Sequence, residues 1–259
     1  GNIYIGGTGK TSLSIKIKKI FNEKNVKTCF IKKYYKNQTD EQKLLKNNGK
    51  LFLELKRNDA LYKAEKEGYE VAILDDGLQD KSIDYDISFI CFNNINWIGN
   101  GMTIPAGPLR ENIKNLKNYD HIFFNGNLEN SEDLKQQALK INHKINVHFG
   151  KYELKNIEKF NLDEKYLVFS GIGNHETFIS MLKNYGFQII KDIEFPDHYK
   201  FTTKDIKKIL ITANKLGCKI VTTEKDYLRL DYIDQENIKF IKSELKIINE
   251  EKLIKTLLN

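Results

Sequence analysis

The sequence predicts an α/β protein: a P-loop-type, doubly wound, mostly parallel sheet followed by a second, smaller α/β unit joined to it by a linker. Short apolar runs alternate with helix-like segments along the chain, which is typical of parallel sheets. A glycine-rich loop at residues 6–11 (GGTGKT) separates the first apolar run from the first helix-like segment. A later apolar run ends in Asp75 and Asp76, as expected at the ligand-binding edge of such a sheet.

The first part of the chain supplies most of the predicted strands. A helix is expected over residues 11–22, where apolar positions recur among lysines. A second helix is expected over residues 60–65, because Asn58 and Asp59 can cap its start and Gly68 can end it. The predicted strands of this part are 2–5, 28–31, 70–76, 87–92 and 121–124.

The sequence pattern changes between residues 147 and 165. Residues 147–154 alternate polar and apolar side chains as an exposed strand does, and a polar stretch follows. We therefore expect a nucleotide-binding unit over residues 1–146 and a linker over 147–165. A second α/β unit is expected over 166–259, with a terminal helix that packs back on the first unit.

The second part has helix and strand signals of its own. Asn174 is a candidate cap for a helix that Gly186 ends. Thr202 and Asp205 form a capping-box pattern for a helix that ends at Gly217, although the acid is Asp rather than Glu. The other expected elements are strands at 166–170 and 219–222 and a terminal helix that includes 253–258.

The composition is that of a folded, basic protein. The 259 residues (30.2 kDa) include 42 Lys and Arg against 35 Asp and Glu, which gives a net charge of +7 and a pI near 9.0. A hydrophobic content of 40% argues against a disordered or fibrous chain. The charge suggests an anionic partner, but the lysines are spread along the chain and no nucleic-acid-binding motif is present. We therefore expect no nucleic-acid partner.

The cysteines and the apolar runs bear on the cellular setting. Cys29, Cys91 and Cys218 are too widely spaced for a disulfide framework or a metal motif, which favours a reducing compartment. No run approaches the roughly 20 apolar residues that span a bilayer. The chain begins at Gly1 and reaches the glycine-rich loop at Gly6. We therefore expect an N-terminal piece to be missing, so that the absence of a membrane segment says little about the full-length protein.

The glycine-rich loop is the first candidate site. Glycines let the backbone wrap around an anion, and the amides at the following helix N-terminus point at it. Lys10 would reach the β- and γ-phosphates of a nucleotide, and the Thr11 hydroxyl would bind Mg²⁺. The usual pattern has another glycine where Tyr4 stands, so the loop is a variant. The alternative is a glycine-rich turn with a surface lysine. The predicted nucleotide-binding residues are Gly6, Gly7, Thr8, Gly9, Lys10, Thr11 and Ser12.

The paired acids are the second candidate site. Asp75 and Asp76 end an apolar strand, and one of them can hold Mg²⁺ directly or through water while the other supports it. The alternative is a simple strand-terminating turn, because Asp76 is followed by Gly77 and Asp-Gly is a common turn pair. The glycine-rich loop upstream favours the metal-binding interpretation.

Six segments together resemble the tetraacyldisaccharide 4'-kinase family, the lipid A 4'-kinases of Gram-negative bacteria. The glycine-rich loop matches the variant P-loop of that family, and residues 75–79 match its DDGLQ motif. The most distinctive match is GNG at 99–101 followed by PAGPLRE at 105–111. Three landmarks of the second half also match, in family order: GIGN at 171–174, FPDH at 195–198 and TEKD at 223–226.

The resemblance implies an ATP- and Mg²⁺-dependent kinase. Its substrate would be a tetraacylated glucosamine disaccharide 1-phosphate, phosphorylated on the 4'-hydroxyl to give lipid IVA. The resemblance also implies two α/β/α units joined by a two-stranded linker, and an N-terminal membrane helix that would precede Gly1. We accordingly expect a monomer on the cytoplasmic face of the inner membrane, in contact with its anionic lipid surface.

The resemblance also assigns roles to individual residues. The candidate catalytic residues are Asp40, His198 and Lys10: Asp40 would accept the proton of the acceptor hydroxyl, and His198 would pair with it. Arg110, Glu111 and Asn100 are candidate substrate residues. The predicted metal ligands are Thr11, Asp75, Asp76 and Glu41.

The chain departs from the family pattern after its second strand. The family has SRGY and, after an insertion, GDEP, where this chain has residues 32–35 (KKYY) and, shortly afterwards, 39–42 (TDEQ). The Asp-Glu pair is kept, but its flanking glycine and proline are not. The short intervening segment predicts a reduced flap over the nucleotide.

Two other functions remain open at this point. The first is a P-loop GTPase or ATPase switch that acts through a protein partner, since residues 223–226 superficially resemble the NKxD motif of GTPases, although in the wrong order. The second is a nucleic-acid binder that uses the basic charge, but this leaves the glycine-rich loop and the paired acids without a role.

Overall fold

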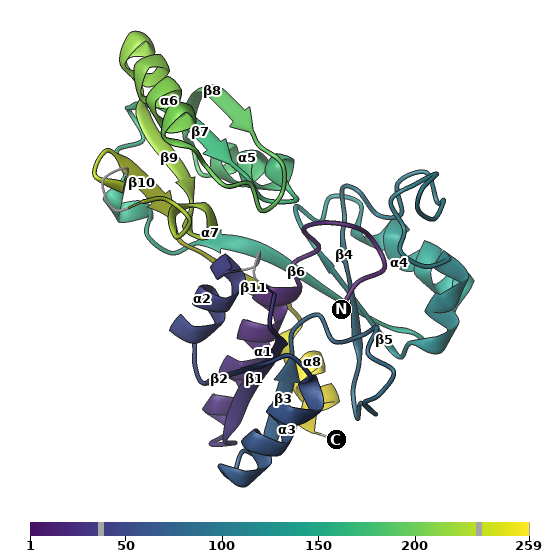
Figure 1. The fold of residues 1–259 in the computed structure, drawn as a ribbon. Helices are drawn as coiled ribbons and strands as arrows, with labels where there is room; N and C mark the ends of the chain where they lie inside the picture. Colours follow the sequence, from purple (N-terminus) through teal and green to yellow (C-terminus); the bar gives the residue numbers. More distant parts are fainter. Residues whose placement is uncertain (36–38, 232–234, 259) are drawn as a thin grey trace. The chain divides into compact units, whose positions relative to one another are not determined.

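The structure, a computed structural model, describes residues 1–35, 39–231 and 235–258 and divides them into two units (Figure 1). The first unit comprises residues 1–151 together with the C-terminal segment from Leu245. The second unit comprises Tyr152–Glu244. The chain passes between the units within strands β6 (Asn146–Leu154) and β11 (Ser243–Ile248), so both connections are strands.

A parallel three-stranded sheet of order β2-β1-β3 forms one half of the first unit. Helix α1 packs on β1 and β3, and helix α3 packs on β1 and β2. The elements are α1 (Lys10–Glu23), β1 (Thr28–Lys33), α2 (Thr39–Asn47), β2 (Leu51–Glu54), α3 (Arg57–Lys66) and β3 (Val71–Leu74). The helix predicted over 11–22 is confirmed as α1, and the strands predicted near 28–31 and 70–76 are confirmed as β1 and β3.

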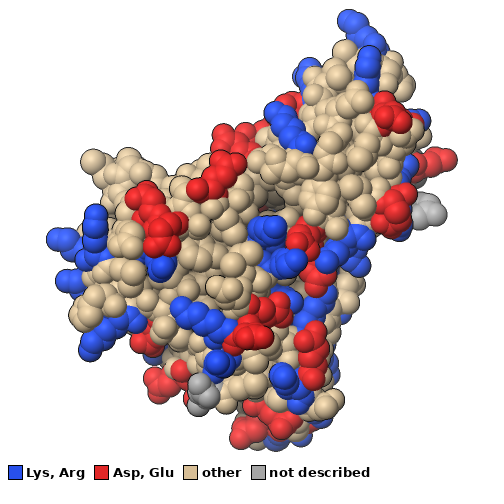
Figure 2. Space-filling model, turned by 180° about the vertical axis from the view of Figure 1, so that it is seen from behind, with Lys and Arg blue, Asp and Glu red and all other residues tan. Residues whose placement is uncertain are grey.

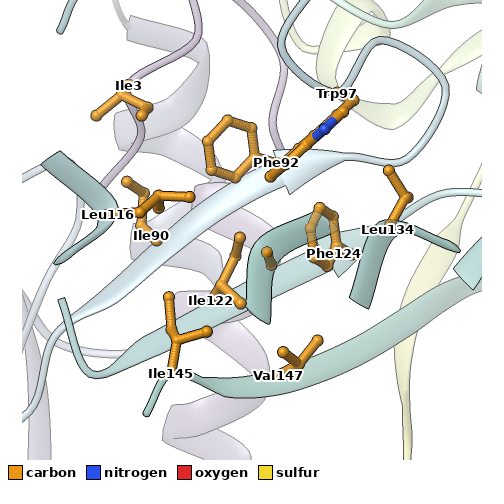
Figure 3. Packing of buried hydrophobic residues seen from close by; sticks show 11 residues of the cluster. Ile3, Ile90, Phe92, Trp97, Leu116, Ile122, Phe124, Leu134, Ile145 and Val147 are labelled. Atoms are coloured by element: carbon orange, nitrogen blue, oxygen red, sulfur yellow. The ribbon is translucent and has the colours of Figure 1, made fainter. Parts of the chain in front are cut away.

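A four-stranded sheet of order β11-β6-β5-β4 forms the other half, with β4, β5 and β6 parallel. Its further elements are β4 (Phe89–Asn93), η1 (Ile113–Asn118), β5 (His121–Asn125), α4 (Ser131–Ile141) and α8 (Glu250–Leu258). One hydrophobic core cluster lies here: the rings of Phe92 and Phe124 lie 4.7 Å and 5.0 Å from that of Trp97 (Figure 3). The mostly parallel α/β fold that the sequence predicts is therefore confirmed.

The strand predicted at residues 2–5 is wrong. These residues, all described, form an isolated bridge between Tyr4 and Leu109 rather than a strand. The Ile5 amide donates to the Pro108 carbonyl (2.9 Å), so this segment pairs with a loop. Gly6 then turns the chain at a φ of +93°. The apolar run is nevertheless buried, because Ile3 joins the core of the second sheet (Figure 3).

The second unit is built on a parallel sheet of order β10-β9-β7-β8. Its elements are η2 (Ile157–Lys159), β7 (Lys165–Ser170), α5 (His175–Asn184), β8 (Gln188–Glu194), α6 (Thr203–Leu216), β9 (Lys219–Thr223), α7 (Glu224–Tyr227) and β10 (Ile238–Ile241). The predicted caps are confirmed: Asn174 accepts from the Thr177 amide, and Thr202 and Asp205 form a reciprocal capping box. Gly217 ends α6 in the left-handed conformation.

The unit boundaries differ from the expected ones. Most of the segment expected as a linker, 147–165, is structured, with Leu154 and Phe160 buried in the core of the second unit. The C-terminal helix α8 packs back on the first unit, as expected, and its Glu250 forms an ion pair with Lys16 (2.9 Å). Strand β11 returns the chain to the first unit by pairing with β6, which is why the second unit ends at Glu244 rather than at the C-terminus.

Helix α3 also begins earlier than expected. Lys56 is its N-cap, and Asn58 and Asp59 lie inside its first turn rather than capping it. The Arg57 side chain is buried and bound to groups beyond the helix, which anchors the start of α3 at that residue.

Charged side chains of both signs are mixed on the molecular surface. On the face drawn in Figure 2, Lys and Arg side chains lie among Asp and Glu side chains. Exposed ion pairs such as Lys50–Glu67 (2.8 Å) are typical of this arrangement. No helix among the described residues has both the length and the apolar sequence needed to cross a bilayer.

A buried histidine pair lies in the four-stranded sheet. His148 on β6 is 3% exposed, and its Nε2 lies 3.4 Å from Nδ1 of His121 on β5. The Phe89 ring lies against both imidazoles. Burial lowers the pKa of His148 to about 4, and the neighbouring His121 and Lys252 act in the same direction. The pair is therefore neutral at pH 7 and packs as part of the core.

We predict that this pair makes the first unit less stable in acid. The pKa of His148 is about 4 in the folded protein but about 6.5 in the unfolded chain, so unfolding takes up a proton between these values. Stability should therefore be lost as the pH falls from 7 to 4. Relative to His148→Gln, the wild-type protein should lose roughly 2–3 kcal/mol more over this interval.

Urea unfolding followed by the fluorescence of Trp97, the only tryptophan of the chain, measures this effect in the first unit. His143→Gln is the matched control, because His143 is exposed, and it should keep the wild-type pH dependence. Parallel pH curves for the wild-type protein and His148→Gln would contradict the prediction.

Candidate active site

The glycine-rich loop connects the first bridged segment to helix α1 and is shaped for an anion. Gly6 and Gly9 both have positive φ angles, and Gly9 is the N-cap of the 14-residue helix. The amides of the first turn have no partners within the helix and carry the positive end of its dipole. Asn125, buried at the end of β5, donates to the carbonyl of Thr8 (2.6 Å) and holds the loop against the four-stranded sheet.

Lys10, Thr11 and Ser12 form the first turn of α1, directly after this loop. The Thr11 hydroxyl lies 3.2 Å from a carboxylate oxygen of Asp75, although the two residues are 64 positions apart. Asp75 follows β3, and its backbone amide continues the ladder to the carbonyl of Ile31 (3.0 Å). The two candidate sites of the sequence thus meet at the carboxyl end of the three-stranded sheet.

Lys32 is a component of this region that the sequence analysis did not single out. Its side chain is 1% exposed, and its Nζ donates to Asp75 Oδ2 (2.7 Å) and to Glu41 Oε2 (2.8 Å). Burial alone would lower the pKa of Lys32, but the two carboxylates outweigh it and raise this pKa above its usual value. The ammonium is therefore charged. A lysine near the end of the otherwise apolar strand β1 was the available signal.

Asp76 lies between two cationic side chains. Its Oδ1 is 3.8 Å from the Lys10 ammonium, and its Oδ2 is 3.8 Å from the Arg110 guanidinium. The backbone at Asp76 has a φ of +56°, and its carbonyl accepts from Arg57 (2.6 Å). Arg57 also pairs with Asp80 (3.0 Å), so this buried arginine, missed by the sequence analysis, fixes the turn that carries both acids.

The oxygens gathered here fit a magnesium ion. Thr11 offers a hydroxyl and Asp75 a carboxylate, both of them hard ligands of the kind that Mg²⁺ prefers. The Oδ1 atom of Asp76 is buried and accepts no hydrogen bond from the described residues. No group of three or more His, Cys, Asp and Glu side chains within the described ranges could hold a metal alone. Mg²⁺ in proteins is usually bound by one or two carboxylates together with phosphate oxygens and water.

Asp40 and Glu41 both lie in the first turn of α2. Asp40 is 3% exposed, and Glu41 is bound to Lys32. The first unit therefore carries Asp40 next to Glu41, which is linked to Asp75 through the Lys32 ammonium. If Asp40 were simply an acid in a polar loop, its carboxyl group would be solvated. Asp40 is instead buried in a helix.

The three candidate substrate residues have different environments. Asn100 donates to the Ala106 carbonyl (2.9 Å) and accepts from the Met102 amide (3.1 Å), so it shapes its own loop. A Cβ at Gly107 would lie 2.1 Å from Asn100 Oδ1, which explains the glycine there.

Glu111 is likewise engaged in local hydrogen bonds through its side chain, and Arg110 through its backbone amide, which donates to the Ile3 carbonyl (2.6 Å). Glu111 accepts from Asn115 (3.1 Å) and Tyr119 (3.4 Å), and burial together with this carboxylate raises the pKa of Tyr119 to about 12. The Arg110 side chain is 34% exposed beside Asp76. Of the three, Arg110 is the one placed to meet an anionic ligand near the paired acids.

His198 belongs to the second unit, where the three landmarks of the second half converge. Its backbone has a φ of +58°, and its amide donates to the carbonyl of Gly171 (3.1 Å). Arg229 donates to the same carbonyl (2.7 Å) and to Asp226 (2.8 Å), and lies 3.5 Å from Nδ1 of His198. Asp226 is fully buried and accepts from the Thr223 hydroxyl (2.7 Å). Burial raises the pKa of Asp226, whereas Arg229 and Thr223 lower it.

The sequence analysis missed Arg229, which links all three of these landmarks. Because Asp40 and His198 lie in different units, their pairing stays a prediction. What the second unit contributes by itself is a histidine whose backbone and ring are both held by neighbours.

Comparison with known proteins agrees with these features. A family model described as tetraacyldisaccharide-1-P 4'-kinase (LpxK) matches residues 1–259. The tetraacyldisaccharide 4'-kinase of Pelagibacter ubique (strain HTCC1062) is 57% identical over 258 residues, covering 100% of this chain and 82% of the relative. The tetraacyldisaccharide 4'-kinase of Rickettsia canadensis (strain McKiel) is 31% identical over 266 residues, covering 96% and 80%.

A solved structure shows the same fold. The crystal structure of the "apo" form of LpxK from Aquifex aeolicus in complex with ATP superposes with a TM-score of 0.68 and covers 98% of this chain and 85% of that one. At 23% identity this likeness bears on the fold alone. The family model and the relatives bear on the family, which phosphorylates a lipid A precursor and depends on ATP and Mg²⁺. The chain belongs to the tetraacyldisaccharide 4'-kinase family.

Proposed function

We propose that this chain transfers the γ-phosphate of ATP to the 4'-hydroxyl of a tetraacyldisaccharide 1-phosphate, which gives lipid IVA. One observation supports the proposal most directly: the Thr11 hydroxyl, at the end of the glycine-rich loop, contacts the Asp75 carboxylate. The chain that carries this contact belongs to this kinase family. Phosphoryl transfer needs positioning and charge neutralisation more than covalent help from the protein. The glycine-rich loop and the acids beside it have the chemistry for both.

In this proposal, the first unit binds the nucleotide. The backbone amides of residues 6–12 would surround the phosphates, and Lys10 would neutralise charge on the transferred group. Asp75, Asp76 and Thr11 would hold Mg²⁺, which lowers the charge of the phosphates when bound. Glu41, the fourth predicted ligand, accepts a hydrogen bond from Lys32. Its negative charge would act on the metal site from a position beyond the Lys32 ammonium.

Asp40 is the proposed base that accepts the proton of the 4'-hydroxyl. Its burial in the first turn of α2 supports this role, since a carboxylate shielded from water interacts more strongly with the proton it receives. His198 is proposed as its partner from the second unit. Arg229, at 3.5 Å from Nδ1 of His198, suits a tautomer that carries its proton on Nε2, from which it can donate a hydrogen bond to a carboxylate.

Arg110 is the proposed contact to the anionic substrate, while Asn100 and Glu111 shape the loop that carries it. The four acyl chains of the substrate would keep it in a membrane. We therefore propose that the protein acts as a monomer at the cytoplasmic, anionic surface of the inner membrane. The basic excess of +7 supports attraction to such a surface.

A phosphate-transfer assay with ATP, Mg²⁺ and a tetraacyldisaccharide 1-phosphate in detergent micelles tests the proposed reaction. Formation of a product phosphorylated at the 4'-position is the expected result. Hydrolysis of nucleotide at the same rate without the lipid acceptor would favour the switch alternative instead. The TEKD segment gives that alternative no support, because Thr223 and Asp226 are engaged with each other and with Arg229 inside the second unit.

We predict that Asp40→Asn lowers kcat about 10²–10⁴-fold, because the amide cannot accept the proton of the acceptor hydroxyl. The affinity for ADP and Mg²⁺, measured by calorimetry, should change less than about threefold, since the proposed base does not contact the nucleotide. Asp59→Asn is the matched control, because Asp59 lies in the first turn of α3 and is exposed; it should keep the wild-type kcat. A normal kcat for Asp40→Asn would remove Asp40 from the mechanism.

We also predict that Asp76→Asn and Asp75→Asn raise the Mg²⁺ concentration needed for half-maximal activity by about tenfold or more, since each loses a charged oxygen ligand. Titration of ADP in the presence and absence of Mg²⁺ separates metal binding from nucleotide binding: only the Mg²⁺-dependent affinity should fall. Asp84→Asn, at an exposed position in the following loop, serves as the control. If both variants keep the wild-type dependence on Mg²⁺, the metal assignment is wrong.

A further inference from the structure

Lys32 is a buried cation beside the proposed metal site, but it is not one of the predicted site residues. It stands where the sequence departs from the family pattern, at the start of residues 32–35 (KKYY). Its ammonium is enclosed by protein and reaches carboxylates from two different elements, Asp75 after β3 and Glu41 on α2. Burial removes water from the ammonium, which costs free energy. Nearby negative charges must offset this cost for the lysine to remain buried and charged.

We propose that Lys32 is a positioning residue that ties the start of α2, and with it Asp40, to the metal-binding end of the three-stranded sheet. This inference rests on the proposed function. The tie is direct, because both hydrogen bonds of the ammonium are short, at 2.7 Å to Asp75 and 2.8 Å to Glu41. Asp40 is the neighbour of Glu41, so a shift of the first turn of α2 moves Asp40 as well.

The same contact orients Asp75. Lys32 binds Oδ2, and the Thr11 hydroxyl lies 3.2 Å from the same oxygen and 3.4 Å from Oδ1. The carboxylate is thus held between the Lys32 ammonium and Thr11, the residue that would share the metal. Because the ammonium belongs to the protein, this orientation exists before any metal or nucleotide arrives, and little of it has to be established during the reaction.

Without the ammonium, Asp75 and Glu41 would face each other as two carboxylates with nothing between them. Like charges at such a separation repel, and the repulsion is strong in a buried site. We expect outward movement of α2 to reduce this repulsion, because the backbone amide of Asp75 is hydrogen-bonded to the sheet and Asp75 cannot move as easily. Lys32 therefore bears on the position of α2 more than on the nucleotide itself.

Three variants test the proposal. Lys32→Met keeps the aliphatic volume and removes the charge. Lys32→Arg keeps the charge and offers two donors to the two carboxylates. Lys33→Met is the matched control, because Lys33 is the next residue of β1 and its ammonium lies over the Tyr35 ring instead. Each is compared with the wild-type protein for kcat, for ADP–Mg²⁺ affinity and for amide hydrogen exchange of residues 42–46 in α2.

Lys32→Met should lower kcat about 100-fold, the effect expected of roughly 1 Å of misplacement, while ADP–Mg²⁺ affinity changes less than about threefold. Exchange in α2 should rise about tenfold or more, but exchange in α4 should not. Lys32→Arg should restore much of both properties, and Lys33→Met should resemble the wild-type protein. Hydrogen exchange does not depend on the lipid reaction, so an inactive wild-type enzyme would count against the proposed function and not against this inference.

Unchanged exchange in α2, or an unchanged kcat, in Lys32→Met would overturn the proposal. A parallel fall in kcat and in ADP–Mg²⁺ affinity would also overturn it, because it would assign Lys32 to nucleotide binding. If Lys32→Met does not fold, Glu41→Gln replaces it, since this variant keeps the Lys32–Asp75 pair and weakens the hydrogen bond between Lys32 and α2. Wild-type exchange in α2 of Glu41→Gln would then be the contrary result.

Discussion

A single buried positive charge governs the nucleotide end of the first unit. The Lys32 ammonium, 1% exposed, is stable there only because Asp75 and Glu41 both bind it, since an unpaired charge in such a place costs several kcal/mol. Removal of one member of a buried pair typically costs about 3–5 kcal/mol. This constraint fixes β1, the end of β3 and the start of α2 relative to one another, and through Asp75 it also fixes Thr11 at the start of α1.

The glycine-rich loop depends on both sheets of the first unit. Asp75, at the end of β3 in one sheet, accepts from Thr11 just after the loop. Asn125, at the end of β5 in the other, donates to the carbonyl of Thr8 within it. The glycines of the loop allow unusual backbone conformations, but they have no side chains that could fix the shape of the loop. Its shape is therefore imposed from outside, by polar residues at the carboxyl ends of two sets of parallel strands.

The sequence predicted features whose signal is local and missed those whose partners are distant. Helix α1, the caps at Asn174 and Thr202 and the approach of Thr11 to Asp75 follow from short motifs in known contexts. Lys32 and Arg57 bind acids that lie 43 and 23 positions away in the chain, and Arg229 binds the nearby Asp226 and also the Gly171 carbonyl, 58 positions away. The strand predicted at 2–5 failed for the same reason: its apolar pattern is real, but its partner is a loop at 108–110.

The second unit shows how separate motifs become one site. Gly171 lies so close to Pro196 and Arg229 that a Cβ would meet their atoms at 3.2 Å and 3.3 Å, so this position favours glycine. Its carbonyl binds both Arg229 and the amide of His198. His198 has a left-handed backbone, which costs an L-residue roughly 1–2 kcal/mol and persists only where its surroundings hold it. The strained backbone and the guanidinium beside the ring support the role proposed for His198, because backbone strain of this kind gathers at functional sites.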